Sequence, residues 1–240
     1  MTENSPGNPL DRVSTLTFDI FGTVLDLAGS IVPPLEEILR SCEAHESITG
    51  ADVWSHWRQR QRIEQYQDNL LMLGHSGYLA VMKRALLYSL RTLKIEFTYK
   101  QIDELMKAYQ GLTPFQDAID GLKRLGTKYQ LVILSNGEGR YLEHLVKNRI
   151  GIDFHAILSA ELVGQFKPHP SVYRFAAKSL ELEPGQIMMV ASHSFDILGA
   201  RYSGFRGAYV NRYGLPYDES EYRPDFTTVD FNELCVKLEV

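Results

Sequence analysis

Short apolar runs alternate with amphipathic stretches through most of the chain. Five runs are apolar and of strand length, at 14–20, 130–134, 155–158, 186–191 and 207–211. Stretches with helical periodicity lie between or beside them, at 115–125, 140–148, 170–180 and 196–203. Alternating buried strands and helices are typical of a parallel sheet covered on both faces. We therefore predict an α/β fold whose core is a doubly wound, Rossmann-like parallel sheet.

The region between the first two apolar runs shows helical periodicity only. Four amphipathic helices are predicted there, at 32–42, 53–73, 78–93 and 100–109. In the third, Leu79, Met82, Leu86 and Leu90 recur at the spacing of one helix face. We predict an all-helical cap at 29–113, inserted after the first strand of a core formed by 1–28 and 114–240. The first 13 residues are predicted to be a flexible polar leader.

Composition narrows the class of protein. The chain has 240 residues, 44% of them hydrophobic, which excludes a disordered chain. A formal charge of −5 argues against a surface for nucleic acid or anionic membrane. Two cysteines, Cys42 and Cys235, exclude a disulfide framework and a cysteine-based metal site. No signal sequence and no run near the roughly 18 apolar residues of a membrane span is visible. We expect a soluble, cytoplasmic protein.

Polar side chains follow the predicted strands at the points where they end. Asp19 lies inside the first run at its carboxyl end, Ser135 and Asn136 follow the second, and Lys167 and Asp196 lie beyond the later runs. Ligands of such sheets bind at the carboxyl ends of the strands. Each residue alone has a structural explanation: a carboxylate that accepts turn N–H groups, a turn, a solvated lysine or a helix cap. Four such segments, each at the end of a separate strand, predict one shared site.

These residues form motifs that resemble the haloacid dehalogenase superfamily. Phe18-Asp19-Ile-Phe-Gly-Thr23 resembles its first motif, Leu134-Ser-Asn-Gly137 its second, Phe166-Lys167-Pro168 its third and Ala191-Ser-His-Ser-Phe-Asp196 its fourth. The superfamily resemblance implies the α/β core with a helical cap. Most members are magnesium-dependent phosphatases, whose first motif carries a second Asp as general acid. Phe21 occupies that position here, and Ser192 replaces a metal-binding Asp, so phosphatase activity is not expected.

The pattern instead resembles the type II L-2-haloacid dehalogenases. Trp57-Arg-Gln-Arg-Gln61 matches the cap motif of that branch, and Lys167-Pro168 with Tyr173 matches its third motif. Asp196-Ile-Leu-Gly-Ala-Arg-Tyr-Ser-Gly204 matches its fourth motif. The resemblance implies hydrolysis of (S)-2-haloalkanoic acids to 2-hydroxy acids through an aspartyl ester, without metal or organic cofactor.

The same resemblance implies roles for individual residues. Asp19 is the nucleophile, and Lys167 keeps it ionised. Thr23 and Ser192 orient it, and Asp196 holds Lys167 or activates water. Ser135 binds the substrate carboxylate, and Arg58 and Asn136 receive the halide, unless Arg58 is part of a solvated charge run. Tyr173 is expected to hydrogen-bond near Ser192 or Lys167. The remaining pocket residues are expected to be Phe21, Gln59, Arg62, Tyr78, His193 and Phe195.

Several pocket positions depart from the branch. Phe21 replaces Tyr, His193 replaces Asn, Phe195 replaces Trp, and Arg62 lies near a position where the branch has an apolar residue. His193 either donates to a leaving group or water, or fills space. The alternatives are the same hydrolase chemistry on another small carboxylate (an ester, lactone or epoxide), a residual magnesium phosphatase, or a non-catalytic binding protein.

The expected partner is a small-molecule carboxylate, with a homodimer possible. Aromatic residues of the cap, Trp54, Tyr66, Tyr78 and Tyr88, fit either a dimer interface or packing inside the cap, of which we favour packing.

Overall fold

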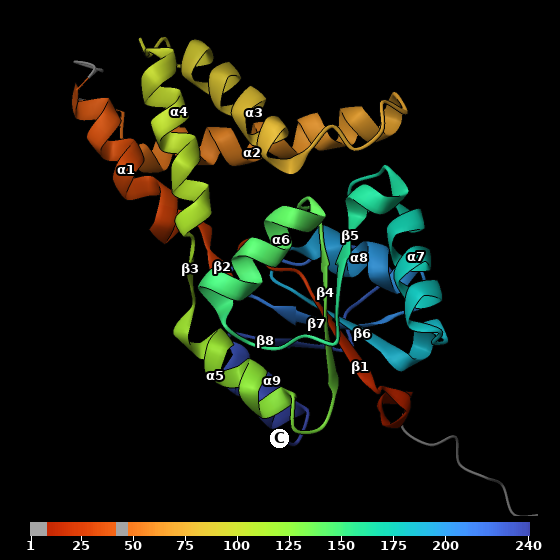
Figure 1. Cartoon of the computed structure of the whole chain (residues 1–240). Coiled ribbons are helices and arrows are strands. Elements are labelled where there is room, and N and C mark those ends of the chain that lie inside the picture. The colour runs from red at the N-terminus through yellow and green to blue at the C-terminus, as the bar shows by residue number, and fades with distance from the viewer. Residues whose placement is uncertain (1–8, 42–47) are drawn as a thin grey trace, which may run out of the picture.

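The computed structural model describes residues 9–41 and 48–240, so residues 1–8 of the predicted leader and Cys42 lie outside it. Its centre is a six-stranded parallel sheet with the strand order β5-β4-β1-β6-β7-β8 (Figure 1). The strands are β1 (Thr15–Phe18), β4 (Gln130–Ser135), β5 (Ala156–Ser159), β6 (Ile187–Ala191), β7 (Arg206–Val210) and β8 (Phe226–Thr228). The central strand β1 pairs with β4 on one side and β6 on the other. Asp19, which follows β1, therefore lies in the middle of the sheet's carboxyl edge.

Helices cover both faces of this sheet. On one face pack α5 (Gln116–Leu125), α6 (Gly139–Leu145) and α9 (Phe231–Lys237), and on the other α7 (Pro170–Leu180) and α8 (Ser194–Tyr202). Alternate residues of β4 and β6 enter the two clusters, because successive strand side chains point to opposite faces. Thus Met188 and Val190 join the first cluster, and Met189 and Ala191 join the second. The predicted doubly wound α/β fold is confirmed.

Four cap helices lie above the carboxyl edge of the sheet (Figure 1). They are α1 (Leu27–Ser41), α2 (Gly50–Leu70), α3 (Tyr78–Thr92) and α4 (Tyr99–Lys107). A capping box between Thr49 and Asp52 starts α2, and another between Thr98 and Gln101 starts α4. Where the chain leaves and re-enters the core, β2 (Leu25–Asp26) pairs antiparallel with β3 (Thr113–Pro114). The predicted boundaries after residues 28 and 113 fall beside this pair and stay a prediction.

Several short elements were not predicted. They are β2, β3, β8 and α9, the 3₁₀ helices η1 (Pro9–Arg12), η2 (Ala108–Gly111), η4 (Ala160–Val163) and η5 (Pro184–Gln186), and the π-helical turn η3 (Val146–Ile150). The prediction of a flexible leader through residue 13 was wrong at its end, because η1 is ordered and Val13 is buried. Within the described residues, no helix combines the length and the apolar character needed to cross a bilayer.

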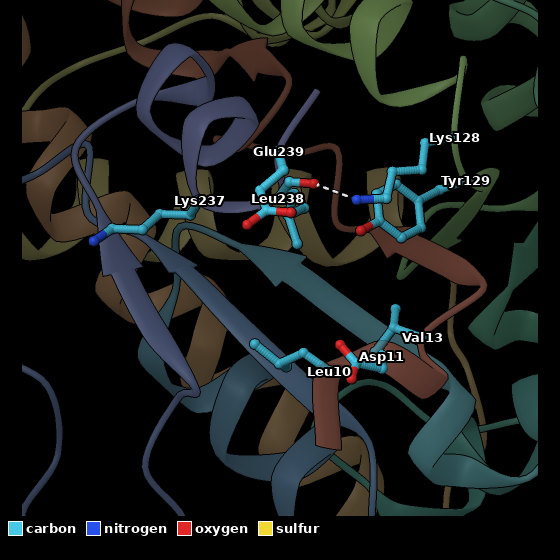
Figure 2. A pocket seen from close by; sticks show the side chains of 8 residues that line it. All are labelled: Leu10, Asp11, Val13, Lys128, Tyr129, Lys237, Leu238 and Glu239. Atoms are coloured by element: carbon cyan, nitrogen blue, oxygen red, sulfur yellow. Dashed lines mark hydrogen bonds between the residues drawn. The ribbon is translucent and has the colours of Figure 1, made fainter. Parts of the chain in front are cut away.

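A cavity of about 310 Å³ lies at the amino-terminal edge of the sheet. It is bordered by Leu10 and Val13 before β1, by Lys128 and Tyr129 before β4, and by the C-terminal residues (Figure 2). The Lys128 ammonium donates a hydrogen bond to the Leu238 carbonyl across it, at 2.8 Å (Figure 2). This cavity is at the opposite edge from Asp19 and contains none of the predicted site residues.

Candidate active site

Asp19 is held in the turn that follows β1. Only 6% of its surface is exposed. The Thr23 hydroxyl donates to Asp19 Oδ2 at 2.9 Å and accepts from the Ser192 amide at 2.9 Å, so it ties the β1 and β6 ends together. Gly22 has a φ of 87°, and a Cβ there would lie 2.8 Å from the Tyr213 hydroxyl. Glycine is therefore needed for the turn that presents Asp19.

Lys167 lies between two carboxylates. Its Nζ donates to Asp19 Oδ1 at 3.1 Å, to Asp196 Oδ2 at 2.5 Å and to the Leu134 carbonyl at 2.8 Å. All three ammonium protons therefore have an acceptor, although the residue is only 1% exposed. The Tyr173 hydroxyl donates to Asp196 Oδ1 at 2.8 Å, beside Lys167, whose ammonium binds the other oxygen of that carboxylate. This contact forms because α7 and α8 pack together and bring Tyr173 against the first turn of α8.

These contacts set opposite charge preferences on the two carboxyl groups. Burial raises the pKa of Asp19, but Lys167, with a contribution from His193, more than offsets this and leaves that pKa well below its usual range. Burial raises the pKa of Asp196 to about 6, because Lys167 offsets it only in part and the Asp19 charge adds to it. Burial opposes the charge of Lys167, but Asp19 and Asp196 together raise its pKa above the ordinary value. Asp19 is thus an ionised carboxylate held ready for nucleophilic attack.

Ser135 and Asn136 lie at the end of β4, beside Lys167. The Asn136 side-chain carbonyl accepts from the Lys167 amide at 2.7 Å, and the Ser135 hydroxyl accepts from the Gly137 amide at 3.3 Å. The Asn136 backbone carbonyl lies 2.8 Å from His75 Nε2, a residue of the segment between α2 and α3. The two residues therefore belong to the same cluster as Asp19, as the strand-end argument predicts.

His193 joins the nucleophile to the cap. Its Nδ1 lies 3.4 Å from Asp19 Oδ2, and its Nε2 lies 3.4 Å from Nη2 of Arg58. Burial lowers the pKa of His193, and Arg58 and Arg62 lower it further, against the opposing effect of Asp19. A guanidinium has only donors, so Nε2 accepts from Arg58 and Nδ1–H points to Asp19. His193 is therefore a neutral imidazole in a defined tautomer.

Cap residues complete the site. Arg58 is held by the side chain of Gln61 and by the face of Trp54, 5.5 Å from the ring centre. Tyr78 stacks on Phe21 with ring centres 4.0 Å apart and planes 7° apart, so the core and the cap touch directly over the nucleophile turn.

A cavity of about 370 Å³ lies next to these groups, bordered by Arg58, Arg62 and His193. The guanidinium of Arg62 lies 5.4 Å from the ring centre of Phe195. Gln59 is exposed and lies on the border of this cavity.

Two neighbours of the site were not predicted. Gln61 is buried and holds Arg58, and Tyr213 follows β7, borders the cavity and donates to the Gly22 carbonyl at 2.8 Å. Tyr213 could have been predicted from sequence, because ligands bind at the carboxyl ends of the strands and Tyr213 follows β7 as Asp19 follows β1. Predicting that Gln61 is buried would require knowing which face of α2 points into the protein. The sequence pattern of α2 does not define that face.

A magnesium ion does not fit the donor set around Asp19. The space between the Asp19 and Asp196 carboxylates is taken by the Lys167 ammonium, and Phe21 and Ser192 supply no carboxylate. Magnesium prefers hard oxygen ligands in octahedral geometry. Within the described part of the chain, no cluster of three His, Cys, Asp or Glu side chains is placed to hold a metal ion.

Comparison with known proteins agrees with this geometry. A family profile for haloacid dehalogenase-like hydrolases matches residues 13–204. The chain belongs to the haloacid dehalogenase-like hydrolase family. Within this family it is 31% identical to (S)-2-haloacid dehalogenase 4A of Burkholderia cepacia, over 90% of each chain. It is 27% identical to haloacetate dehalogenase H-2 of Moraxella sp. (strain B), over 91% of this chain and 94% of the relative.

The fold of the chain also matches a solved structure of this family. The L-2-haloacid dehalogenase of Xanthobacter autotrophicus, with chloropropionic acid covalently bound, is 26% identical and superposes with a TM-score of 0.79. The match covers 95% of this chain and 98% of that protein. The haloacid dehalogenase-like fold with its helical cap therefore extends over nearly the whole chain.

Proposed function

We propose that the chain is a hydrolytic dehalogenase that converts (S)-2-haloalkanoic acids to 2-hydroxy acids through an ester on Asp19. The observation that carries the proposal is the position of Lys167, which bridges Asp19 and Asp196 while Phe21 stands where a phosphatase has its general acid. This arrangement gives a charged nucleophile without a proton donor for an alcohol leaving group. A halide needs no proton to leave, so the site suits carbon–halogen cleavage.

In the first step, a carboxylate oxygen of Asp19 attacks C2 of the substrate from the side opposite the halogen. The new C–O bond forms as the carbon–halogen bond breaks, and the bonding pair leaves with the halide. Arg58 is the guanidinium that contacts His193 beside Asp19, since its Nη2 lies 3.4 Å from His193 Nε2. A guanidinium supplies the charge that a departing halide lacks in a buried site. Ser135 supplies a hydroxyl group for the substrate carboxylate, and the Asn136 amide assists Arg58 at the halide.

In the second step, water adds to Cγ of Asp19 and the bond between Cγ and the ester oxygen breaks. The products are the 2-hydroxy acid with inverted configuration at C2, the regenerated carboxylate, and one proton released with the halide. Both oxygens of Asp196 are engaged, by Lys167 and by Tyr173, which supports its role in holding Lys167. Thr23 and the Ser192 amide stay fixed beside the reacting carboxylate.

The test is halide release from both enantiomers of 2-chloropropionate, from chloroacetate and from fluoroacetate, measured with EDTA present. We expect release from the S enantiomer of 2-chloropropionate, with R-lactate as product, and loss of activity in Asp19→Asn. In ¹⁸O-labelled water, the peptide containing Asp19 should gain the label during turnover. Release without labelling of Asp19 would rule out the ester, and release from none of the acids would overturn the dehalogenase assignment.

The setting of this activity is part of the same proposal. We place the enzyme in the cytoplasm, acting on a small-molecule carboxylate, as a homodimer and without nucleic acid. Support for packing of the cap aromatics comes from Tyr78, which is 1% exposed, whereas Tyr88 is exposed and free to contribute to an interface.

A further inference from the structure

The cavity beside His193 carries two arginines on one face of α2. Arg58 and Arg62 are one helical turn apart, so their side chains are neighbours on the helix surface. Both border the 370 Å³ cavity, and no carboxylate is among the residues that line it. In the described part of the chain, no acidic side chain forms an ion pair with either arginine. The cavity therefore holds two uncompensated positive charges.

Of the two arginines, Arg62 has fewer of its hydrogen-bonding groups paired. Its Nε is buried and has no hydrogen-bond partner, and its guanidinium rests against the Phe195 ring. The next basic residue on the same helix contrasts with it: Arg60 pairs with Glu64 at 2.7 Å and lies over Tyr88 at 3.9 Å. Burial lowers the pKa of Arg62, and the charge of Arg58 lowers it further, which reflects the cost of placing this second cation here. A half-buried guanidinium that borders a cavity and has no paired carboxylate is a ready site for an anionic group.

One cation is sufficient for the departing halide, and Arg58 is the one in contact with His193 beside Asp19. Ser135 is on the other side of the cluster, at the end of β4, and suits the carboxylate next to the reacting carbon. Arg62 remains without a function in the conversion of a substrate that carries a single carboxylate. A substrate that extends from C2 past His193 into the cavity would place its far end at Arg62.

We propose that Arg62 binds a second, distal carboxylate, so that the preferred substrates are 2-halodicarboxylic acids such as 2-chlorosuccinate. This inference rests on the proposed dehalogenase activity and specifies its substrate class. The competing arrangement, in which Arg62 binds the single carboxylate of any 2-haloacid, makes a different prediction and is separated from it below.

The kinetic test compares 2-chlorosuccinate with 2-chloropropionate in wild type, Arg62→Leu and Arg60→Leu. A charge-assisted contact in a desolvated site is worth roughly ten- to a hundredfold in kcat/KM. We expect wild type to prefer 2-chlorosuccinate, Arg62→Leu to lose that preference by about this factor, and Arg60→Leu to keep it. Equal losses on both acids in Arg62→Leu would overturn the proposal in favour of single-carboxylate binding, as would wild-type preference for 2-chloropropionate.

A binding measurement separates failure of this inference from failure of the proposed activity. Succinate and propionate carry no halogen, so their affinity for wild type by isothermal titration does not depend on turnover. We expect succinate to bind about tenfold or more tightly than propionate, and Arg62→Leu to remove the difference while Arg60→Leu preserves it. Selective succinate binding without halide release from any acid would refute the dehalogenase alone. Halide release without selective succinate binding would refute the role of Arg62 alone.

Discussion

At the scale of single residues, the site is a chain of buried polar contacts in which each side chain binds the next. Lys167 bridges two carboxylates, and His193 links one of them to Arg58. Removing any member leaves a buried charge or a buried polar atom without its partner, which costs more than the lost contact itself. Substitutions here therefore affect both stability and activity, and pH dependence distinguishes the two.

His193 makes the stability of the protein depend on pH near neutrality. Its pKa is lower in the folded protein than its ordinary value of 6.5, because burial and two arginines disfavour the protonated ring. The unfolded chain then binds the proton more readily, so the fold loses stability as pH falls below that ordinary value. Asp196, whose pKa is raised to about 6, affects the stability in the opposite direction. Its contribution is the same in wild type and in a His193 variant, so it cancels in their comparison. We expect the Tm of wild type to fall more than that of His193→Asn between about pH 8 and about pH 5.

Thermal unfolding of both proteins over this pH range measures the difference. His155 is an exposed histidine, so His155→Asn is the matched control and should show the wild-type dependence. A dependence in His193→Asn equal to that of wild type would show that the ring is not held neutral by the fold.

Thr23 is the second residue with a sharp expected effect. Thr23→Val removes the donor to Asp19 Oδ2 and the acceptor for the Ser192 amide, both of them buried. We expect the free energy of unfolding in urea to fall by about 1–3 kcal/mol, with a parallel loss of kcat. Thr23→Ser keeps the hydroxyl and should restore most of both quantities. Failure of Ser to recover activity would assign the effect to packing of the methyl group.

The convergence of Asp19, Ser135, Asn136, Lys167 and Asp196 could be predicted from sequence, because it depends only on where parallel strands end. The partner of Tyr173 could not be predicted, since it depends on how α7 and α8 pack. The catalytic and binding roles assigned to these residues stay predictions until the kinetic tests are made.

At the scale of elements, the last turn of α2 and the segment that follows it connect the cap to the core. The side chain of Asn69 donates to the Phe166 carbonyl and accepts from the Phe166 amide, both at 2.8 Å. His75 stacks on the Phe166 ring with centres 3.9 Å apart. These contacts fix the position of Phe166, the residue before Lys167. The cap therefore helps to define where the lysine lies.

Asn69→Ala should therefore loosen the segment that carries Lys167. Both Phe166 backbone groups lose a partner, at a cost of about 1–3 kcal/mol of local stability. We expect faster hydrogen exchange at the Phe166 and Lys167 amides and a lower kcat. Asn232→Ala, in the exposed first turn of α9, should leave both unchanged. Unchanged exchange at these amides in Asn69→Ala would mean that the core alone positions Lys167.

Most helices and long strands agree with the predicted ranges to within a few residues, because alternation of apolar runs is a strong signal. The elements after residue 211 were not predicted for a physical reason. The polar stretch 211–225 with Gly214 and Pro216 carries no periodicity, and β8 has three residues paired only with β7 at the sheet edge. Short edge strands depend on the neighbour that they pair with more than on their own composition.

At the scale of the whole molecule, one hydrophobic cluster runs from the sheet into the cap. It includes Phe18 of β1, Phe21 of the nucleophile turn, and Trp57, Tyr78 and Tyr109 of the cap. The Tyr141 hydroxyl of α6 also donates to the Tyr109 carbonyl, at 2.6 Å. A continuous core favours cooperative unfolding of cap and sheet, although the chain passes between them only at the β2–β3 pair.

The two tryptophans allow the cooperative unfolding of cap and sheet to be tested. Trp54 and Trp57 both lie in α2, and there are no others in the chain. Tryptophan fluorescence therefore reports on the cap, whereas far-UV circular dichroism reports on all helices. We expect the two urea transitions to coincide in wild type. In Tyr78→Ala, which removes the stack on Phe21, the fluorescence transition should move to lower urea, ahead of the dichroism. An earlier fluorescence transition already in wild type would show that the cap unfolds by itself, and that the cluster does not couple it to the sheet.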